Sequence, residues 1–172
     1  MKLVGVIDAS CVIALDELSL LPSLSWLFEN LHIPRAVRAE LYRRTATKKR
    51  IRTLLREYDF VRRCNDYDQN AVNVLLIDHV LGSKDRGEAE AVVQATKIGA
   101  FVIVDDPWGR KLAEHYSLKY GGTLWVLGRL TELELMTPAG LRKNILRLLE
   151  VGSRFPQEGV NKLLQRFREQ EV

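Results

Sequence analysis

The sequence predicts an α/β fold in three layers, with helices on both faces of a central parallel sheet. Two short apolar runs, Val4–Ile7 and Phe101–Val104, have the continuous hydrophobicity of strands buried on both faces. Segments with helical periodicity separate these runs, and strands that alternate with helices form parallel sheets. The 172 residues, 47% of them hydrophobic, are enough for one sizeable core. We therefore expect an α/β/α domain at 1–135 and a helical C-terminal extension at 136–172 that packs on it.

Four strands are expected where short apolar runs are bounded by polar residues or turn residues. They lie at 3–7, 31–33, near 59–63 and at 101–104. Helices are expected from Ser10 to about Leu15, at roughly 20–30, from Pro34 onward, and at 69–81, 86–98, 107–117, 122–134, 138–150 and 157–169. Ser10 is the expected cap of the first helix, Pro34 suits a first helical turn, and Gly99 suits a helix end. A turn is expected at 82–85.

The two C-terminal helices carry apolar stripes at helical spacing. The stripes consist of Leu141, Ile145, Leu148 and Leu149 in one helix and Val160, Leu163, Leu164 and Phe167 in the other. Such stripes most often pack on their own domain. The alternative is that part of this surface forms a dimer interface or receives a helix from a partner.

Several classes of protein do not fit the composition. No run of about 18 apolar residues exists for a membrane span, and the first residues lack the pattern of a signal peptide, so we expect a cytoplasmic protein without a membrane partner. Cys11 and Cys64 have neither the number nor the spacing of a disulfide framework or a zinc site, and we interpret both as structural thiols.

Acidic residues occupy positions where a core would normally place apolar ones. Asp8 and Asp106 follow two of the predicted strands, and in parallel sheets ligands bind beyond the carboxyl ends of the strands. Glu40 and Glu88 lie beside the apolar faces of two predicted helices, whereas Glu90 is expected to face solvent. Buried, unpaired carboxylates are costly, so these four acids are expected to converge on a cation.

An all-oxygen cluster of this kind suits Mg²⁺ or Mn²⁺ rather than zinc, because no histidine lies at ligand spacing. Such ions can activate water and stabilise the charge that develops when a phosphodiester is hydrolysed. Each acid also has a simpler explanation. Asp8 could simply end a strand or cap a helix, and Asp105 or Asp106 could simply cap a helix. Glu40 could pair with Arg43 or Arg44, and Glu88 could simply interact favourably with the N-terminus of its own helix.

Basic residues are concentrated in one segment, although the formal net charge is only +4. Between Arg43 and Arg52 there are six bases and no acid, namely Arg43, Arg44, Lys48, Lys49, Arg50 and Arg52. Such a segment suits contact with nucleic-acid phosphates. The alternative is a solvated helix face.

Four motifs occur in a fixed order over most of residues 3–135. They are Val6-Ile7-Asp8-Ala9-Ser10, Ile33-Pro34 followed by Val37 and Glu40, Gly87-Glu88-Ala89-Glu90-Ala91, and Val104-Asp105-Asp106 followed by Gly109-Arg110 and Ala113. Together they resemble a PIN-domain protein. The last two motifs resemble the VapC-like branch that is often described only as predicted nucleic-acid-binding protein.

The resemblance implies a Mg²⁺- or Mn²⁺-dependent ribonuclease that cuts single-stranded RNA. Such proteins are often the toxin of a toxin–antitoxin pair, which implies an antitoxin partner, and are often homodimers. By motif match the four acids are Asp8, Glu40, Glu88 and Asp106, with Asp105 as a second candidate for the fourth role and Ser10 as the hydroxyl that supports the first. The chain departs from the common pattern by having glutamate at the third position and Val104 where Thr or Ser often precedes the fourth acid.

Other readings of the sequence fit less well. A haloacid-dehalogenase-type phosphatase needs an aspartate two residues after the first, where this chain has Ser10, and a receiver domain needs an early acidic pair. The stronger rival is a catalytically silent PIN-like module that binds RNA or a protein partner.

Overall fold

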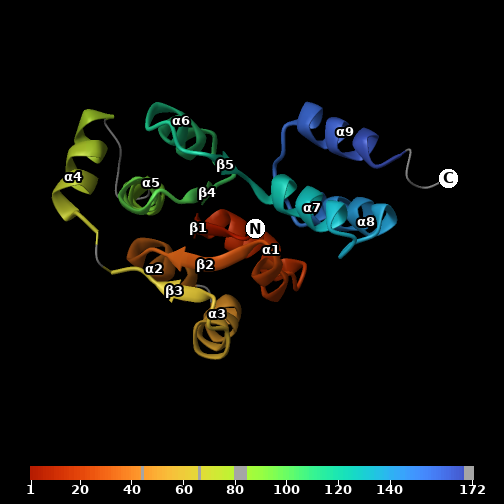
Figure 1. Ribbon diagram of the computed structural model, residues 1–172, viewed down its shortest axis with the longest axis horizontal. Coiled ribbons are helices and arrows are strands. Elements are labelled where there is room, and N and C mark those ends of the chain that lie inside the picture. The colour runs from red at the N-terminus through yellow and green to blue at the C-terminus, as the bar shows by residue number, and fades with distance from the viewer. Residues whose placement is uncertain (44, 66, 80–84, 169–172) are drawn as a thin grey trace.

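The computed structural model of the chain describes residues 1–43, 45–65, 67–79 and 85–168 (Figure 1). At its centre is a five-stranded sheet in which every neighbouring pair of strands is parallel. Its strands are β1 (Leu3–Ile7), β2 (Phe28–Ile33), β3 (Val61–Arg63), β4 (Phe101–Ile103) and β5 (Tyr120–Gly121). Their order across the sheet is β3-β2-β1-β4-β5. The predicted parallel sheet is therefore confirmed.

Helices connect the strands and continue beyond the last one. They are α1 (Ala9–Glu17), the 3₁₀ turn η1 (Pro22–Trp26), α2 (Arg35–Arg43), α3 (Thr45–Glu57), α4 (Gln69–Asp78), α5 (Arg86–Ile98), α6 (Pro107–His115), α7 (Thr123–Glu132), α8 (Pro138–Glu150) and α9 (Gln157–Arg166). The basic segment thus follows α2 as a separate helix, α3. Gly99 ends α5 in the left-handed conformation, with φ 64°.

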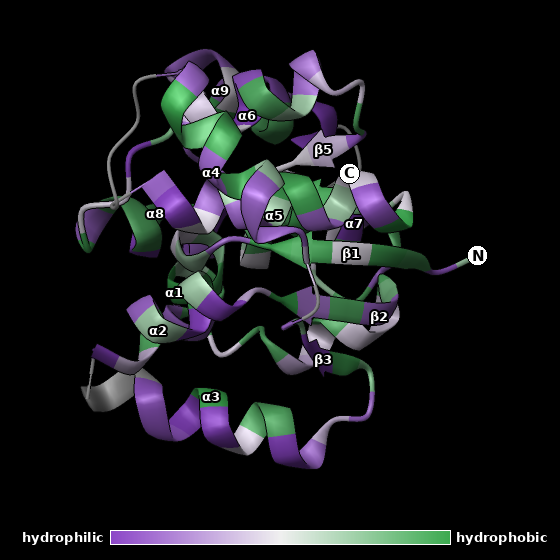
Figure 2. Cartoon of the chain, turned by 90° about the vertical axis from the view of Figure 1, so that its left-hand side faces the viewer, coloured by the Kyte–Doolittle hydropathy of each residue, from purple (hydrophilic) through white to green (hydrophobic). Residues whose placement is uncertain are grey.

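Successive side chains of the strands point to opposite faces of the sheet and enter different parts of the core. Ile7 and Ile103 are fully buried on one face, in a cluster that also contains Leu15 of α1 and Leu130 of α7. Val6 and Val102 lie on the other face, in a cluster with alanines of α5. Helices therefore cover both faces, and the expected three-layer α/β/α fold is confirmed. In Figure 2 the central strand β1 is largely hydrophobic, whereas the outer helix α3 alternates hydrophilic and hydrophobic residues.

The C-terminal helices pack on the rest of the chain through a cluster of their own. Leu141, Ile145 and Leu148 of α8 are buried together with Ala14 of α1 and Leu127 of α7. Val160 and Phe167 join the same cluster from the last segment. Self-packing of the predicted stripes is thus confirmed for these side chains. Leu149 does not take part in this burial, because 41% of its surface is exposed.

Some local predictions are wrong. The helix expected at roughly 20–30 is replaced by η1 and the first half of β2, because Phe28 and Leu31 are both buried in the core under the sheet. Strand β5 was not predicted, since it has two residues, Tyr120 and Gly121, and resembles a glycine turn. The turn expected at 82–85 lies outside the described residues, except for Asp85. Both cysteines are buried, as expected.

Candidate active site

The candidate site lies at the carboxyl edge of the sheet, where β1 and β4 are neighbours. Residues Gly5 to Ile7 pair with Phe101 to Ile103, so the acids that follow the two strands begin side by side. The backbone N–H of Asp8 donates to the carbonyl of Ile103 over 3.0 Å. Parallel pairing thus brings together two segments that are almost a hundred residues apart in the sequence.

Asp8 is the N-cap of α1, and only 2% of its surface is exposed. Its Oδ2 accepts hydrogen bonds from the backbone N–H of Ser10, at 3.2 Å, and from the Ser10 hydroxyl, at 2.7 Å. The prediction that Ser10 caps this helix is therefore wrong, because the preceding aspartate caps it and Ser10 donates to that aspartate. Burial raises the pKa of Asp8 in spite of these hydrogen bonds.

Asp106 has the same relation to α6 that Asp8 has to α1. Its Oδ1 accepts from the backbone N–H groups of Trp108, at 2.8 Å, and Gly109, at 3.4 Å. The simpler explanation, helix capping, is thus true of both aspartates. Capping by Asp106 uses one carboxylate oxygen, so it does not exclude a further role for the other.

Glu88, in the first turn of α5, lies against the first turn of α6. A Cβ atom on Gly109 would be 3.3 Å from Cγ of Glu88 and only 2.5 Å from Cγ2 of Val104. Glycine at this position therefore allows the two helices to approach closely enough for Glu88 to lie beside the Asp106 cap. This explains the glycine in the fourth sequence motif, for which sequence reasoning gave no role.

Gly87 has a corresponding relation to Asp8 and Glu40. A Cβ atom on Gly87 would lie 3.7 Å from Oδ1 of Asp8 and 4.0 Å from Oε2 of Glu40. One carboxylate oxygen from the end of β1 and one from α2 therefore both approach the start of α5, next to Glu88. Glu40 itself is exposed, whereas Asp8 is buried.

The four predicted acids interact electrostatically. The pKa of Glu88 is raised from 4.5 to about 7, first by burial and then by the negative charges of Asp8, Asp106 and Glu40. Carboxylates from the N-caps of α1 and α6 and from α2 and α5 thus share one site. We name Asp8, Glu40, Glu88 and Asp106 the acidic cluster.

Comparison with known proteins bears on this arrangement. The family model DUF3368, described as a PIN domain, matches residues 4–169. The chain belongs to this PIN-domain family. A search of curated proteins found no match. Membership supports a nuclease-type function, since PIN domains are generally hydrolases that use divalent metal ions. The VapC-like branch stays a prediction.

The donor atoms of this PIN domain suit a hard divalent cation, because the acidic cluster offers carboxylate oxygens. The oxygens are not already arranged as a ligand set. Within the described ranges, no group of three His, Cys, Asp or Glu side chains is placed so that it could hold a metal ion. The cluster therefore fits Mg²⁺ or Mn²⁺ in its chemistry, and its side chains would need to adjust to bind one.

Asp105 has a different environment from its neighbour Asp106. Its carboxylate accepts from the backbone N–H of Thr123 over 2.9 Å and from the Thr123 hydroxyl. It also forms an ion pair with Arg110 at 3.4 Å. These contacts tie the end of β4 to α6 and to the first residue of α7. Asp105 is thus occupied by structural contacts, which leaves Asp106 as the candidate for the fourth acidic role.

Glu90 contradicts the sequence analysis. It was expected to face solvent, but only 1% of its surface is exposed. Its carboxylate accepts from the backbone N–H of Ala36 over 2.7 Å and pairs with Arg86 at 3.1 Å. The prediction is wrong because α2 packs on this face of α5 and presents its N-terminal turn to the carboxylate. The sequence signal was Arg86, four residues before Glu90.

The predicted basic segment does not lie together at the acidic cluster. Arg43 lines the same cavity as Glu40. On α3, Lys49 is exposed, Arg50 pairs with Asp16 at 2.7 Å, and Arg52 lies over the ring of Tyr42 at 5.5 Å. Lys48 is half-buried on the same helix, and Arg44 lies outside the described residues.

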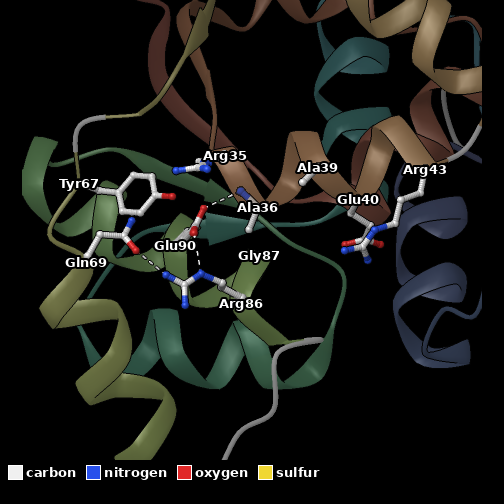
Figure 3. Close-up of a pocket in the computed structure, with 10 residues that line it drawn as sticks. All are labelled: Arg35, Ala36, Ala39, Glu40, Arg43, Tyr67, Gln69, Arg86, Gly87 and Glu90. Carbon is white, nitrogen blue, oxygen red and sulfur yellow. Dashed lines mark hydrogen bonds and ion pairs between the residues drawn. The ribbon is translucent and has the colours of Figure 1, made fainter.

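A cavity of about 640 Å³ opens beside the acidic cluster, between α2, the start of α5 and the segment before α4 (Figure 3). Its lining consists of Arg35, Ala36, Ala39, Glu40, Arg43, Tyr67, Gln69, Arg86, Gly87 and Glu90. Glu40 and Gly87 belong to this lining and also lie near Asp8, so the cavity and the acidic cluster share a border.

None of the helices in the described part of the chain is both long and apolar enough to cross a membrane.

Proposed function

We propose that this PIN domain is a metal-dependent endoribonuclease that hydrolyses phosphodiester bonds of single-stranded RNA. The observation that carries the proposal is the convergence of four carboxylates, because oxygens of Asp8 and Glu40 approach the start of α5 and Glu88 lies against Gly109 beside the Asp106 cap. Carboxylates that repel one another in this way have a clear use with a divalent cation and a poor one without it.

In this proposal the chain's own residues hold and orient the reacting groups. Asp8 and Asp106 are oriented by the helix caps that they form at the starts of α1 and α6. Glu40 and Glu88 complete the charge of the site from α2 and α5. A bound Mg²⁺ or Mn²⁺ would supply the polarisation of the phosphodiester and the activation of water.

The choice of single-stranded RNA as substrate comes from the resemblance to VapC-like proteins. The cavity beside the acidic cluster is compatible with it, because arginines line a space that borders the acids. Arginine binds phosphate groups through charge-assisted hydrogen bonds.

A second candidate is a catalytically silent PIN-like module that binds RNA or a protein. One observation favours it. Among the residues that the structure describes, no three acidic, histidine or cysteine side chains are already placed to hold a metal. An experiment on cleavage separates the two candidates.

The test replaces Asp8 with asparagine. Asparagine also caps helices well, so Asp8→Asn should keep α1 and the fold while removing one charge from the acidic cluster. We expect Mn²⁺-dependent cleavage of a labelled single-stranded RNA to fall by at least about 100-fold, on the order of what loss of a catalytic charge costs. Circular dichroism and thermal unfolding check that the variant is folded.

Asp59→Asn is the matched control, because Asp59 is exposed and precedes β3 at the edge of the sheet. It should leave cleavage unchanged. If Asp8→Asn cleaves as fast as the parent chain, the assigned site is wrong. If the parent chain itself does not cleave RNA with Mn²⁺ or Mg²⁺, the silent module is the better description.

Partners of the chain are also part of this proposal. We propose a homodimer and an antitoxin partner, with the toxin role that the VapC-like resemblance implies. Exposed leucines on the C-terminal side, such as Leu146 and Leu149, offer apolar surface for a protein contact. Light scattering at high concentration tests the dimer, and a monomer there would contradict it.

A further inference from the structure

The cavity beside the acidic cluster carries a specific inference about how RNA is held. Three of its lining residues are arginines, namely Arg35, Arg43 and Arg86. Its volume of about 640 Å³ is within the usual range of sites for small molecules, roughly 300–1,000 Å³.

One pair of charges in the cavity is internally balanced. Glu90 is buried and pairs with Arg86, and it also accepts from the N-terminal turn of α2. Arg86 donates in addition to Gln69 and Asn73. This network connects α5 to α4 along the cavity wall. Because Arg86 and Glu90 neutralise each other, the pair adds no net charge to the cavity.

The face of α2 that lines the cavity has an uneven distribution of charge. Arg35, Ala39 and Arg43 follow one another at intervals of four residues, and all three line the cavity. Eight residues of helix span about 12 Å, so one cation lies toward each end of this face. Glu40 of the acidic cluster lies between them in the sequence. If one phosphate of an RNA strand lies at the acidic cluster, a neighbouring phosphate would therefore lie near Arg35 or Arg43.

Tyr67 forms part of the cavity wall beside this network. Only 7% of Tyr67 is exposed, and burial together with the neighbouring carboxylate of Glu90 raises the pKa of its hydroxyl to about 12. In Figure 3 the hydroxyl end of the ring points toward Arg35 and Glu90. The hydroxyl therefore stays neutral, and Tyr67 adds no charge to the cavity.

We propose that this cavity is the subsite for the nucleotide next to the scissile phosphate, with its phosphate bound by Arg35 and Arg43. The inference rests on the proposed function, because the acidic cluster must be where the RNA is cut. In this proposal the cavity, and not the basic helix α3, is the main RNA-binding surface. There Arg50 is paired with Asp16 and Arg52 is placed over Tyr42, whereas Arg35 lies in the same cavity as Glu40.

The first experiment changes the charge of the cavity at an exposed alanine. Ala39 lines the cavity and lies on the surface of α2, so both Ala39→Glu and Ala39→Gln should fold. The probe is a fluorescent single-stranded RNA of about ten nucleotides, a length within known site sizes, measured by anisotropy with EDTA at low salt. We expect Ala39→Glu to bind it at least about tenfold more weakly than Ala39→Gln, because the added carboxylate repels phosphate.

The second experiment compares two cations. Arg35→Ala should weaken binding of the same RNA by about tenfold and lower the slope of log K against log salt by about one. Lys49→Ala, which removes an exposed cation of α3, should change neither quantity.

The outcomes separate this inference from the proposed function. If Lys49→Ala weakens binding as much as Arg35→Ala, or if Ala39→Glu and Ala39→Gln bind equally, the subsite is wrong even where the parent chain cleaves RNA. If the cavity receives a protein segment instead of RNA, Ala39→Glu and Ala39→Gln would bind RNA equally. If binding follows Arg35 but Asp8→Asn still cleaves, the subsite stands and the catalytic assignment fails. If the parent chain binds no RNA, the subsite is wrong, and if it also cleaves none with Mn²⁺ or Mg²⁺, both fail.

Discussion

Single residues of the acidic cluster serve the fold and the proposed chemistry at once. Asp8 and Asp106 each commit one carboxylate oxygen to a helix cap. Glu88 differs from them, because its pKa reflects burial and repulsion by the other acids. Its charge therefore works against the folded state at neutral pH.

The charge of Glu88 predicts a pH dependence of stability in metal-free protein. Its pKa is about 7 in the folded chain, against an ordinary value of 4.5, so the folded state binds the proton more tightly. This contribution is complete below about pH 4.5 and is lost as the pH rises through about 7. Glu88→Gln should therefore flatten the dependence of the thermal midpoint on pH across this interval. At pH values above 7, the variant should have a higher thermal midpoint than the parent chain.

Glu29→Gln is the control for this measurement, because Glu29 is exposed on β2. Scanning calorimetry with a chelator present gives the midpoints. Parallel pH curves for the parent chain and Glu88→Gln would show that the pKa of Glu88 is not raised in the folded chain.

The residues of the cluster could be predicted because each follows a strand or interrupts an apolar helical face. The residues that shape the cluster could not. Gly109 is required because a Cβ atom there would collide with Val104 and crowd Glu88, which approaches from another helix. The burial of Glu90 depends on how α2 packs against α5, which no local pattern encodes.

Between elements, Asp105 joins the end of β4 to two helices. Its contacts with Thr123 and Arg110 connect α7 and α6 to the sheet beside the acidic cluster. The same carboxylate lies near the buried thiol of Cys11, whose pKa is raised well above its ordinary value by burial and by Asp105. Adjacent aspartates thus have separate tasks.

The division between Asp105 and Asp106 predicts opposite results for two substitutions. Asp105→Ala leaves the N–H and hydroxyl of Thr123 without their acceptor, which should cost about 1–3 kcal/mol in the free energy of unfolding. Asp106→Asn keeps a helix cap and should change stability by less than about 1 kcal/mol, while abolishing Mn²⁺-dependent cleavage. Urea unfolding and the cleavage assay measure the two quantities. The reverse pattern would assign the fourth acidic role to Asp105.

Most elements could be predicted from periodicity and caps, and the errors have physical causes. Helix α8 begins at Pro138 and ends at Glu150, as expected. Strand β5 is too short for alternation to be seen, and β2 begins early because Phe28 gains burial under the sheet. Tertiary contacts decide both cases.

Over the whole molecule, α8 and α9 extend the core rather than forming a separate body. Their cluster includes Ala14 of α1 and Leu127 of α7, so the last helices pack against the first one. Figure 1 shows α7, α8 and α9 side by side at one end of the molecule, with α2, α3 and α4 toward the other. The described residues that line the cavity beside the acidic cluster lie between Arg35 and Glu90, and so not in these last helices.

This packing predicts unequal effects of two neighbouring leucines of α8. Leu148 is fully buried, so Leu148→Ala should lower the free energy of unfolding by about 2–5 kcal/mol. Leu149 is 41% exposed, and Leu149→Ala should change it by less than about 1 kcal/mol. Urea unfolding measures both. A small effect of Leu148→Ala would mean that α8 does not unfold with the rest, and a large effect of Leu149→Ala would indicate cover by a second chain.

The helix caps formed by Asp8 and Asp106 have a consequence for descendants of such a chain. A lineage that lost the proposed RNA cleavage would still need both aspartates, because α1 and α6 begin on them. Selection would release Glu40 and Glu88 first, since no helix start depends on either side chain as a cap. Surveys of this family that score activity by the strand-end aspartates would therefore count inactive members as enzymes, whereas the two glutamates would tell them apart.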